Sequence, residues 1–379
     1  MKILFTQWGL PDKRGGSELF LIEVAAELAR RDHEVAVYAG TVGKIGREFQ
    51  ERTGIPVLGD PRLCPWTPDI IHGQNRIHAL KGLMAFPSAP AILYLHGFLP
   101  VLEKPFLHPR IHRYVAISQG IAKRWIEGLG IPGEKFEIIP NHIDLGRFQR
   151  VRTPSEHPRK ALLYSNGRFT EGQISEIRKA CEARGITLEM AGSCVRRQIT
   201  DPENVLPYYD LVFAVGRSAL EAIASGCGVI PLVGDMAEEM VLPENMGRLG
   251  NQNMSVRVLI HQKLTAEWII SQIDRWNPKD IASVTQWIRE ETSLSKTVDR
   301  LEGIYRSAIS ESREKPLVDL DREIGAIHVM MQKEEAYGAA KQRRMLKNRI
   351  KDMESSWSWK LTAPLRWIQR AALPGNCRN

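Results

Sequence analysis

The residues best suited to chemistry lie in one segment, 215–230, which reads Val-Gly-Arg-Ser-Ala-Leu-Glu-Ala-Ile-Ala-Ser-Gly-Cys-Gly-Val-Ile. We expect a strand to end at Gly216 and a helix to begin near Ser218, which leaves the first amide groups of that helix free. These amides and the positive end of the helix dipole suit a diphosphate, and Arg217 adds positive charge. Glu221 lies one turn into the helix, where its carboxylate can accept hydrogen bonds from ribose hydroxyls. The alternative is a surface glutamate that only stabilises the first turn.

Two further candidate sites also follow strand-like runs. Gly15, Gly16 and Ser17 stand at a predicted strand-to-helix turn, where glycine lets the backbone approach a ligand closely. His96 ends an apolar run and is followed by Gly97, so we expect its imidazole to point into the predicted cleft. A plain turn and a hydrogen-bonded structural histidine are the respective alternatives.

The elements that position these residues alternate as they do in a parallel sheet. Residues 2–8 and 33–39 are strand-like, and apolar residues at helical spacing predict a helix over 17–31 between them. Strand, glycine loop, helix and strand in this order predict a right-handed βαβ unit. Further strands are expected at 69–72, 91–96, 114–117, 136–140, 161–165, 186–191, 211–215 and 229–233.

A polar, proline-containing stretch at 150–160 divides this alternation and predicts a linker. The sequence therefore predicts an α/β protein in which two Rossmann-like domains, 1–150 and 151–310, face a cleft. Ligands of such sheets bind at the carboxyl ends of the strands. A third region, 311–379, is expected to form a helical tail.

The net charge of the chain belongs to that tail. The 379 residues include 52 Lys and Arg against 44 Asp and Glu, a formal net charge of +8. Residues 341–379 alone contain ten Lys and Arg and two acidic residues, so the rest of the chain is neutral. A neutral body argues against a nucleic-acid groove. Three Trp among the cations of 357–368 are typical of an interfacial helix, so we expect the tail to bind an anionic membrane surface.

Apolar residues spaced by three and four predict a short coiled-coil seam at the start of the tail. They are Leu317, Leu320, Ile324, Ile327 and Met331, and a weaker seam follows up to Trp357. Residues 317–357 could therefore pair with a second copy or a partner helix, although a solvent-exposed single helix is the alternative.

The five cysteines form no Cys-x-x-Cys pair and no metal-ligand spacing, so we expect neither a disulfide framework nor a metal site. No apolar run approaches the roughly 18 residues that span a bilayer.

Several of these segments together resemble a known family. Residues 114–118 read Tyr-Val-Ala-Ile-Ser, residues 135–144 read Lys-Phe-Glu-Ile-Ile-Pro-Asn-His-Ile-Asp, and residues 68–72 read Pro-Asp-Ile-Ile-His. With the Ser-Ala-Leu-Glu-Ala-Ile-Ala-Ser-Gly run at 218–226, they are similar, in the family's order, to GT-B glycosyltransferases of the large retaining family-four class. The tail segment 358–366 also resembles a C-terminal element of bacterial cell-surface polysaccharide enzymes.

This resemblance implies roles for the candidate residues. Glu221 would bind the donor ribose, and the backbone from Gly216 to Ala219, together with Arg168 and Arg217, would bind the diphosphate. The loop at 15–17 would lie near the transferred sugar and the acceptor, with His96 at the reacting centre. The resemblance implies a nucleoside-diphosphate sugar as donor substrate, no metal and no other cofactor.

Four positions differ from the family's pattern. Phe213 stands where a second glutamate would precede Glu221, and Gln173 stands where a lysine would follow Gly167-Arg168. In the same comparison, His142 replaces the usual glycine and Gly228 the usual proline.

Two functional hypotheses follow. The first is a glycosyltransferase of bacterial surface-polysaccharide assembly, at the cytoplasmic face of the membrane, that acts on a glycan or glycolipid. The second is a catalytically silent GT-B module that binds a partner enzyme through its tail.

Overall fold

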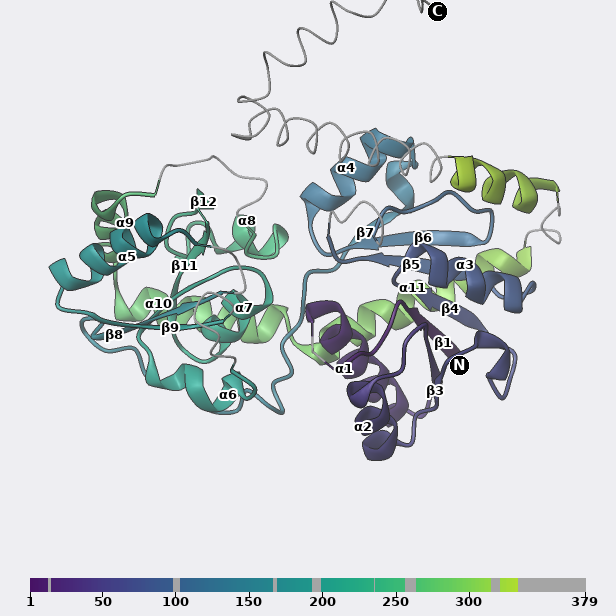
Figure 1. Cartoon of the computed structure of the whole chain (residues 1–379), viewed down its shortest axis with the longest axis horizontal. Coiled ribbons are helices and arrows are strands. Elements are labelled where there is room, and N and C mark those ends of the chain that lie inside the picture. The colour runs from purple at the N-terminus through teal and green to yellow at the C-terminus, as the bar shows by residue number, and fades with distance from the viewer. Residues whose placement is uncertain are drawn as a thin grey trace, which may run out of the picture. The chain divides into compact units, whose positions relative to one another are not determined.

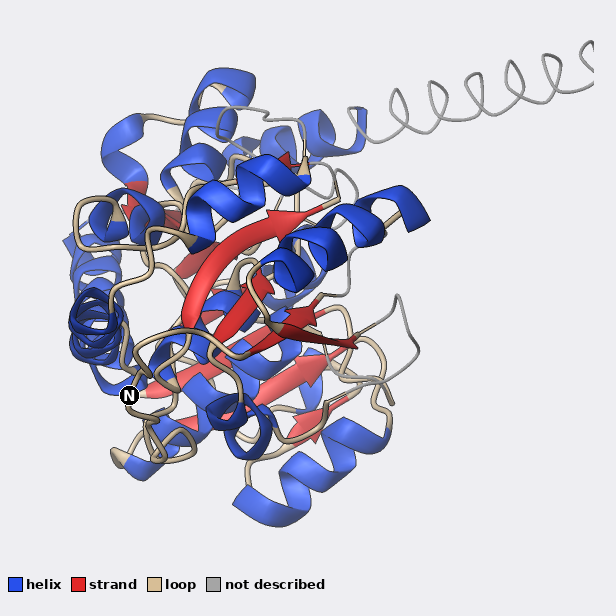
Figure 2. Cartoon of the chain, turned by 90° about the vertical axis from the view of Figure 1, so that its left-hand side faces the viewer, coloured by secondary structure: helices blue, strands red, loops and turns tan. Residues whose placement is uncertain are grey.

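Seven strands form the first of two sheets, in the order β3-β2-β1-β4-β5-β6-β7, and every pairing in it is parallel. Its central strands are buried almost throughout because helices pack against the sheet. Figure 2 shows helices on both sides of the strands that face the viewer. The strands are β1 (Lys2–Gln7), β2 (Glu34–Ala39), β3 (Val57–Leu58), β4 (Ile70–Gly73), β5 (Ala91–Leu95), β6 (Ile111–Ala116) and β7 (Phe136–Ile138). The helices between them are α1 (Gly16–Arg30), α2 (Lys44–Thr53), α3 (Arg76–Ala85) and α4 (Gln119–Leu129), with 3-10 turns at Pro61–Leu63 and Gly133–Lys135.

The second sheet has five strands in the order β12-β11-β10-β8-β9. All of them pair in parallel except β12, which is antiparallel to β11. The strands are β8 (Lys160–Tyr164), β9 (Thr187–Ala191), β10 (Leu211–Ala214), β11 (Gly228–Val233) and β12 (Met236–Ala237). The helices of this region are α5 (Glu171–Ala183), α6 (Pro202–Val205), α7 (Arg217–Ala224), α8 (Met246–Asn251), α9 (Ala266–Ile273), α10 (Pro278–Glu291) and α11 (Leu294–Glu314), with a 3-10 turn at Leu206–Tyr208.

These elements come from a computed structural model that describes residues 1–12, 15–97, 103–165, 169–192, 199–234, 236–255, 264–314 and 321–332. Both sheets belong to one unit, Met1–Val318, and a second unit begins at Asp319. Figure 1 labels most of the elements of both sheets. The predicted α/β fold with two Rossmann-like sheets is confirmed, and the predicted strands and helices lie within a few residues of the observed ones.

Helix α11 connects the end of the chain's second sheet back to the first. Its residues follow the second sheet in sequence, yet it packs against α1 and against β4, β5 and β6 (Figure 1). The Tyr305 hydroxyl lies 2.6 Å from Nδ1 of the fully buried His72. Arg31, the residue that follows α1, also contacts Asp299 of α11 at 2.5 Å. The first sheet is therefore completed by residues that the sequence pattern assigned to the second domain.

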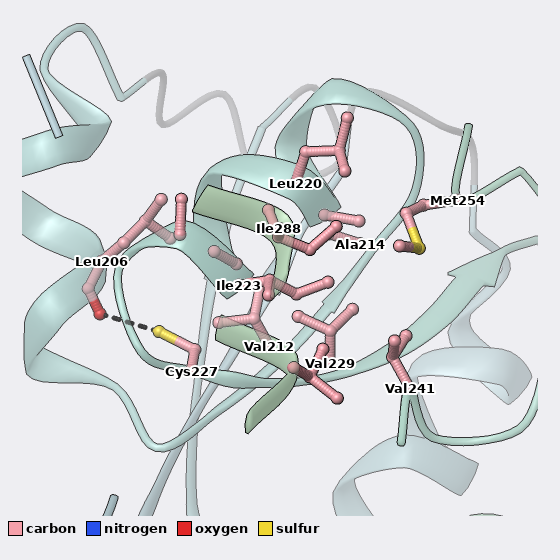
Figure 3. Close-up of a cluster of buried hydrophobic side chains, with 14 of the residues drawn as sticks. Leu206, Val212, Ala214, Leu220, Ile223, Cys227, Val229, Val241, Met254 and Ile288 are labelled. Carbon is pink, nitrogen blue, oxygen red and sulfur yellow. Dashed lines mark hydrogen bonds between the residues drawn. The ribbon is translucent and has the colours of Figure 1, made fainter. Parts of the chain in front are cut away.

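An apolar cluster supports the helix that carries the candidate nucleotide residues. Figure 3 shows Val212 and Ala214 of β10 and Val229 of β11 packed with Leu220 and Ile223 of α7. The fully buried Cys227 donates its thiol to the carbonyl of Leu206 at 3.3 Å, which fixes the turn after α7. Small residues on α7 let it approach the sheet closely, so its first residue has a defined position at the strand ends.

The second unit is described only as a helix over 321–332, on which Ile324 and Met331 are exposed. Leu317, Leu320 and the weaker seam lie outside the described residues, so coiled-coil pairing over 317–357 stays a prediction. The basic segment 341–379 also lies outside them. No helix in the described part of the chain is both long and apolar enough to cross a membrane.

Candidate functional site

The start of α7 combines an unusual glycine with unfilled capping positions. Gly216 has φ +61° and ψ −133°, a conformation that L side chains rarely adopt. Its amide donates to the carbonyl of Met254 at 3.0 Å, and no side chain caps the helix. The helix therefore begins at the carboxyl end of β10 with first-turn amides available to an anion.

Arg217, the first residue of α7, holds two carboxylates at once. Its Nε donates to Oε1 of Glu221 at 2.9 Å, one turn further along the same helix. Its Nη2 donates to both oxygens of Glu23 at 2.6 Å, and Glu23 lies on α1 beside the first sheet. All three side chains are at least nine-tenths buried. The guanidinium thus links the two Rossmann-like halves of the unit.

Two more donors surround Glu23. Nε2 of the fully buried His142 lies 2.9 Å from Glu23 Oε2, and Arg147 Nη1 donates to Glu23 Oε1 at 3.1 Å. Arg147 also pairs with Glu203 at 2.8 Å. Because an ionised carboxylate only accepts, the hydrogen of the neutral His142 ring must be on Nε2.

The surroundings shift the pKa values of both carboxyls, in opposite directions. Burial alone would raise the pKa of Glu23, but Arg217 and His142 outweigh it and lower that pKa to about 2. Burial raises the pKa of Glu221, and its single contact with Arg217 offsets this only in part. Burial also lowers the pKa of His142, against the opposing effect of Glu23. We conclude that Glu23 is the ionised partner that holds Arg217.

The ring of His96 lies close to this cluster. It packs on Phe20 of α1 and on Tyr94 of β5, each at 4.9 Å between centroids, and Phe20 also contacts the ring of His142 at 5.1 Å. Burial lowers the pKa of His96 to about 3, and the positive charge of Arg217 acts in the same direction. At neutral pH this imidazole is uncharged, so one of its nitrogens can donate a hydrogen bond and the other can accept one.

The structure describes all but one of the other predicted site residues. Gly15 is the N-cap residue of α1, and Gly16 and Ser17 are the first two residues of that helix. The Ser17 hydroxyl lies 3.1 Å from Glu18. Ser218 is the second residue of α7, and Ala219 after it is fully buried. Arg168 lies outside the described residues.

Two of the four positions that differ from the family's pattern, Phe213 and Gln173, have structural roles. Phe213 is fully buried in an apolar cluster with Leu163 and Ile230, so its side chain faces the core of the second sheet. Gln173 forms a reciprocal cap with Thr170 at the start of α5. Gln173 is thus occupied in beginning a helix.

A groove of about 610 Å³ lies beside Glu23 and Arg147. It is bordered by α1 and α2 on one side and by Asp201 and Glu203 on the other. The two halves of the unit therefore enclose a groove next to the ion-paired cluster. No group of three or more metal-ligating side chains occurs within the ranges that the structure describes.

Sequence reasoning missed Glu23, Arg147 and the hydrogen-bonding role of His142. The one available signal was His142 itself, a histidine in place of the glycine in the family's pattern. Nothing local marks Glu23, because a glutamate on an amphipathic helix is normally solvent-exposed.

Comparisons with known proteins agree with this description. Residues 14–147 match the model of Glycosyltransferase Family 4. A glycosyltransferase from Rickettsia africae ESF-5 has a similar structure, with a TM-score of 0.60 and 14% identity over 81% of this chain and 99% of that one. An enzyme assigned as a UDP-N-acetylglucosamine 2-epimerase from Listeria monocytogenes has a TM-score of 0.51 and 14% identity over 82% and 98% of the two chains. No curated protein matches the sequence.

At this identity, the structural likeness establishes the fold alone. The predicted family resemblance is confirmed over the first Rossmann-like half, and the predicted two-sheet architecture is confirmed over the unit as a whole. The chain has the GT-B fold, and its residues 14–147 match the sequence model of Glycosyltransferase Family 4.

Proposed function

We propose that this protein transfers a sugar from a nucleoside-diphosphate donor to a glycan or glycolipid acceptor, with retention of configuration. One observation carries the proposal: α7 begins without a cap at the carboxyl end of β10, and the carboxylate of Glu221 stands one turn further on. The match of residues 14–147 to Glycosyltransferase Family 4 supports transfer as the reaction class.

The donor would be held by backbone and side chain together. The amides of Ser218 and Ala219 would contact the diphosphate, where the helix dipole stabilises the negative charge of the leaving group without a metal. Glu221 would accept hydrogen bonds from the ribose. The start of α1 at 15–17 would face the sugar and the acceptor, and the neutral imidazole of His96 would hydrogen-bond at the reacting centre.

Calorimetry with UDP, GDP, ADP and dTDP tests the nucleotide site. We expect one of these to bind the wild-type chain, and Glu221→Ala to weaken that binding about tenfold or more because a buried acceptor for the ribose is lost. Asp210→Asn is the matched control. Asp210 is buried but precedes β10 at the opposite, amino end of the strand, so its replacement should leave nucleotide affinity unchanged. Equal nucleotide affinity of Glu221→Ala and wild type would refute the assignment of Glu221 to the ribose.

A turnover measurement distinguishes a glycosyltransferase from a catalytically silent GT-B module. The burial of Phe213 in the core motivates the alternative, since the second half then supplies only one of the family's two carboxylates. Release of nucleoside diphosphate from a nucleotide sugar by the purified chain would support the enzyme. Binding without turnover, together with co-purification of a second enzyme that depends on residues 311–379, would support the partner-binding module.

We further propose that the acceptor belongs to bacterial surface-polysaccharide assembly and that residues 341–379 bring the protein to the inner face of the cytoplasmic membrane. The ten cations and three Trp of that region support this placement. Vesicles containing anionic lipid should sediment the full chain, and deletion of residues 341–379 should release it. Equal sedimentation with and without these residues would refute the membrane role.

A further inference from the structure

The carboxylate of Glu221 is held by one oxygen and left open at the other. Arg217 Nε occupies Oε1, and no hydrogen bond to Oε2 is found among the described residues. A buried carboxylate with one oxygen fixed and one unoccupied is oriented for a ligand hydroxyl. The orientation of Glu221 therefore depends on where Arg217 is held.

Arg217 cannot hold itself in place through Glu221 alone. A single contact four residues along one helix leaves a long side chain several rotamers. Its position is fixed from the other half of the unit, because Glu23 takes Nη2 with both of its oxygens at 2.6 Å. Glu23 is itself fixed by the fully buried His142 at 2.9 Å and by Arg147 at 3.1 Å.

The charges favour the same assignment. Two carboxylates face the one guanidinium of Arg217, so its positive charge is already balanced inside the protein. A phosphate placed against it would meet Glu23 and Glu221 as well, and the repulsion would offset much of the attraction. The helix-start amides of α7 remain available to a diphosphate, whereas the guanidinium is engaged in holding carboxylates.

We propose that Glu23 is a positioning residue of the nucleotide site: it acts through Arg217 to orient Glu221, so that the first Rossmann-like half completes a site carried by the second. This role rests on the proposed function and belongs to a residue that no local sequence pattern marks. In this proposal Glu23 affects nucleotide binding only through Arg217 and Glu221.

Nucleoside-diphosphate affinity, measured by calorimetry with whichever of UDP, GDP, ADP and dTDP binds the wild-type chain, tests this. Glu23→Gln keeps the shape of the side chain but removes its charge, and should weaken binding about tenfold. Glu27→Gln is the matched control. Glu27 lies one turn further along α1, is similarly buried and is paired with Arg30 and Arg31, away from Arg217. Its replacement should leave the affinity unchanged.

A double variant identifies the route of the effect. In the Glu221→Gln background, Glu23→Gln should cause little further loss, since the group that it positions has already been changed. Independent, additive losses would overturn the proposal, and so would tighter binding by Glu23→Gln, which would show that Glu23 blocks the site. If Glu23→Gln does not fold, Glu23→Asp keeps the charge and withdraws the carboxylate; unchanged affinity of this variant would also overturn it.

The outcomes separate this inference from the proposed function. If the wild-type chain binds no nucleoside diphosphate, the proposed function fails. If the wild-type chain binds one and Glu23→Gln binds it equally well, the proposed function stands and the positioning role of Glu23 is wrong.

Discussion

Mild acid should destabilise this protein through its buried imidazoles, and His96 allows the size of the effect to be worked out. Burial lowers the pKa of His96 from 6.5 to about 3. Its ring packs on Phe20 and Tyr94, and its Nε2 is buried with no hydrogen-bond partner within the described part of the chain. The His96 side chain is partly buried, and a positive charge on the ring would lose the hydration of Nε2 without a hydrogen-bond partner in the described part of the chain.

The sign and the pH window follow from linkage. The unfolded chain takes up a proton at His96 as the pH falls through 6.5, whereas the folded chain does so only near 3, so stability falls between these values. At about pH 5, roughly 1.5 pH units below 6.5, the loss in unfolding free energy is about 2 kcal/mol. Burial also lowers the pKa values of His72 and His142, which adds to the loss. The lowered pKa of Glu23 contributes only below about 4.5.

Urea denaturation of wild type and His96→Gln near pH 7.5 and near pH 5 measures this effect. We expect the pH-dependent loss to be about 2 kcal/mol smaller in His96→Gln. His157→Gln, which replaces an exposed histidine, is the control and should lose as much as wild type. The Cε1 proton resonance of His96 should not titrate above pH 5. Titration near 6.5, or an equal pH-dependent loss in His96→Gln, would refute the reasoning.

Three substitutions test the packing around the site by their unfolding free energies. Phe213→Glu would place an acid eight positions before Glu221, but that acid would be buried in the apolar core. We therefore expect a loss of unfolding free energy above about 3 kcal/mol and no gain in nucleotide affinity. Tighter nucleotide binding would contradict the burial of Phe213. Tyr305→Phe removes the hydroxyl that lies 2.6 Å from Nδ1 of His72 and should cost about 1–3 kcal/mol. An unchanged midpoint would show that this contact is not formed. Gly216→Ala forces a side chain into φ +61° and should cost about 1–3 kcal/mol by strain alone, because its nearest neighbour is 3.9 Å away; full stability would mean that the turn relaxes.

Much of the fold could be predicted from the sequence because its signals are local. The apolar runs at 2–8 and 91–96 predict buried strands whether or not their neighbours are known, and they correspond to β1 and β5. The glycine before Arg217 and the helical spacing after it predict where α7 begins, and the structure places that start one residue before the expected position. The family resemblance rests on such local motifs too, and it is confirmed over residues 14–147.

Local sequence patterns are enough to predict which elements form and which residue types stand at the strand ends, because periodicity and turn residues act over a few positions. The folded structure was needed to find that Glu23, 194 residues from Arg217 along the chain, is its principal partner. It also decided that α11 returns to the first sheet and that Phe213 faces the core. The physical reason is that ion pairs and packing depend on distance in space, which local sequence patterns do not encode.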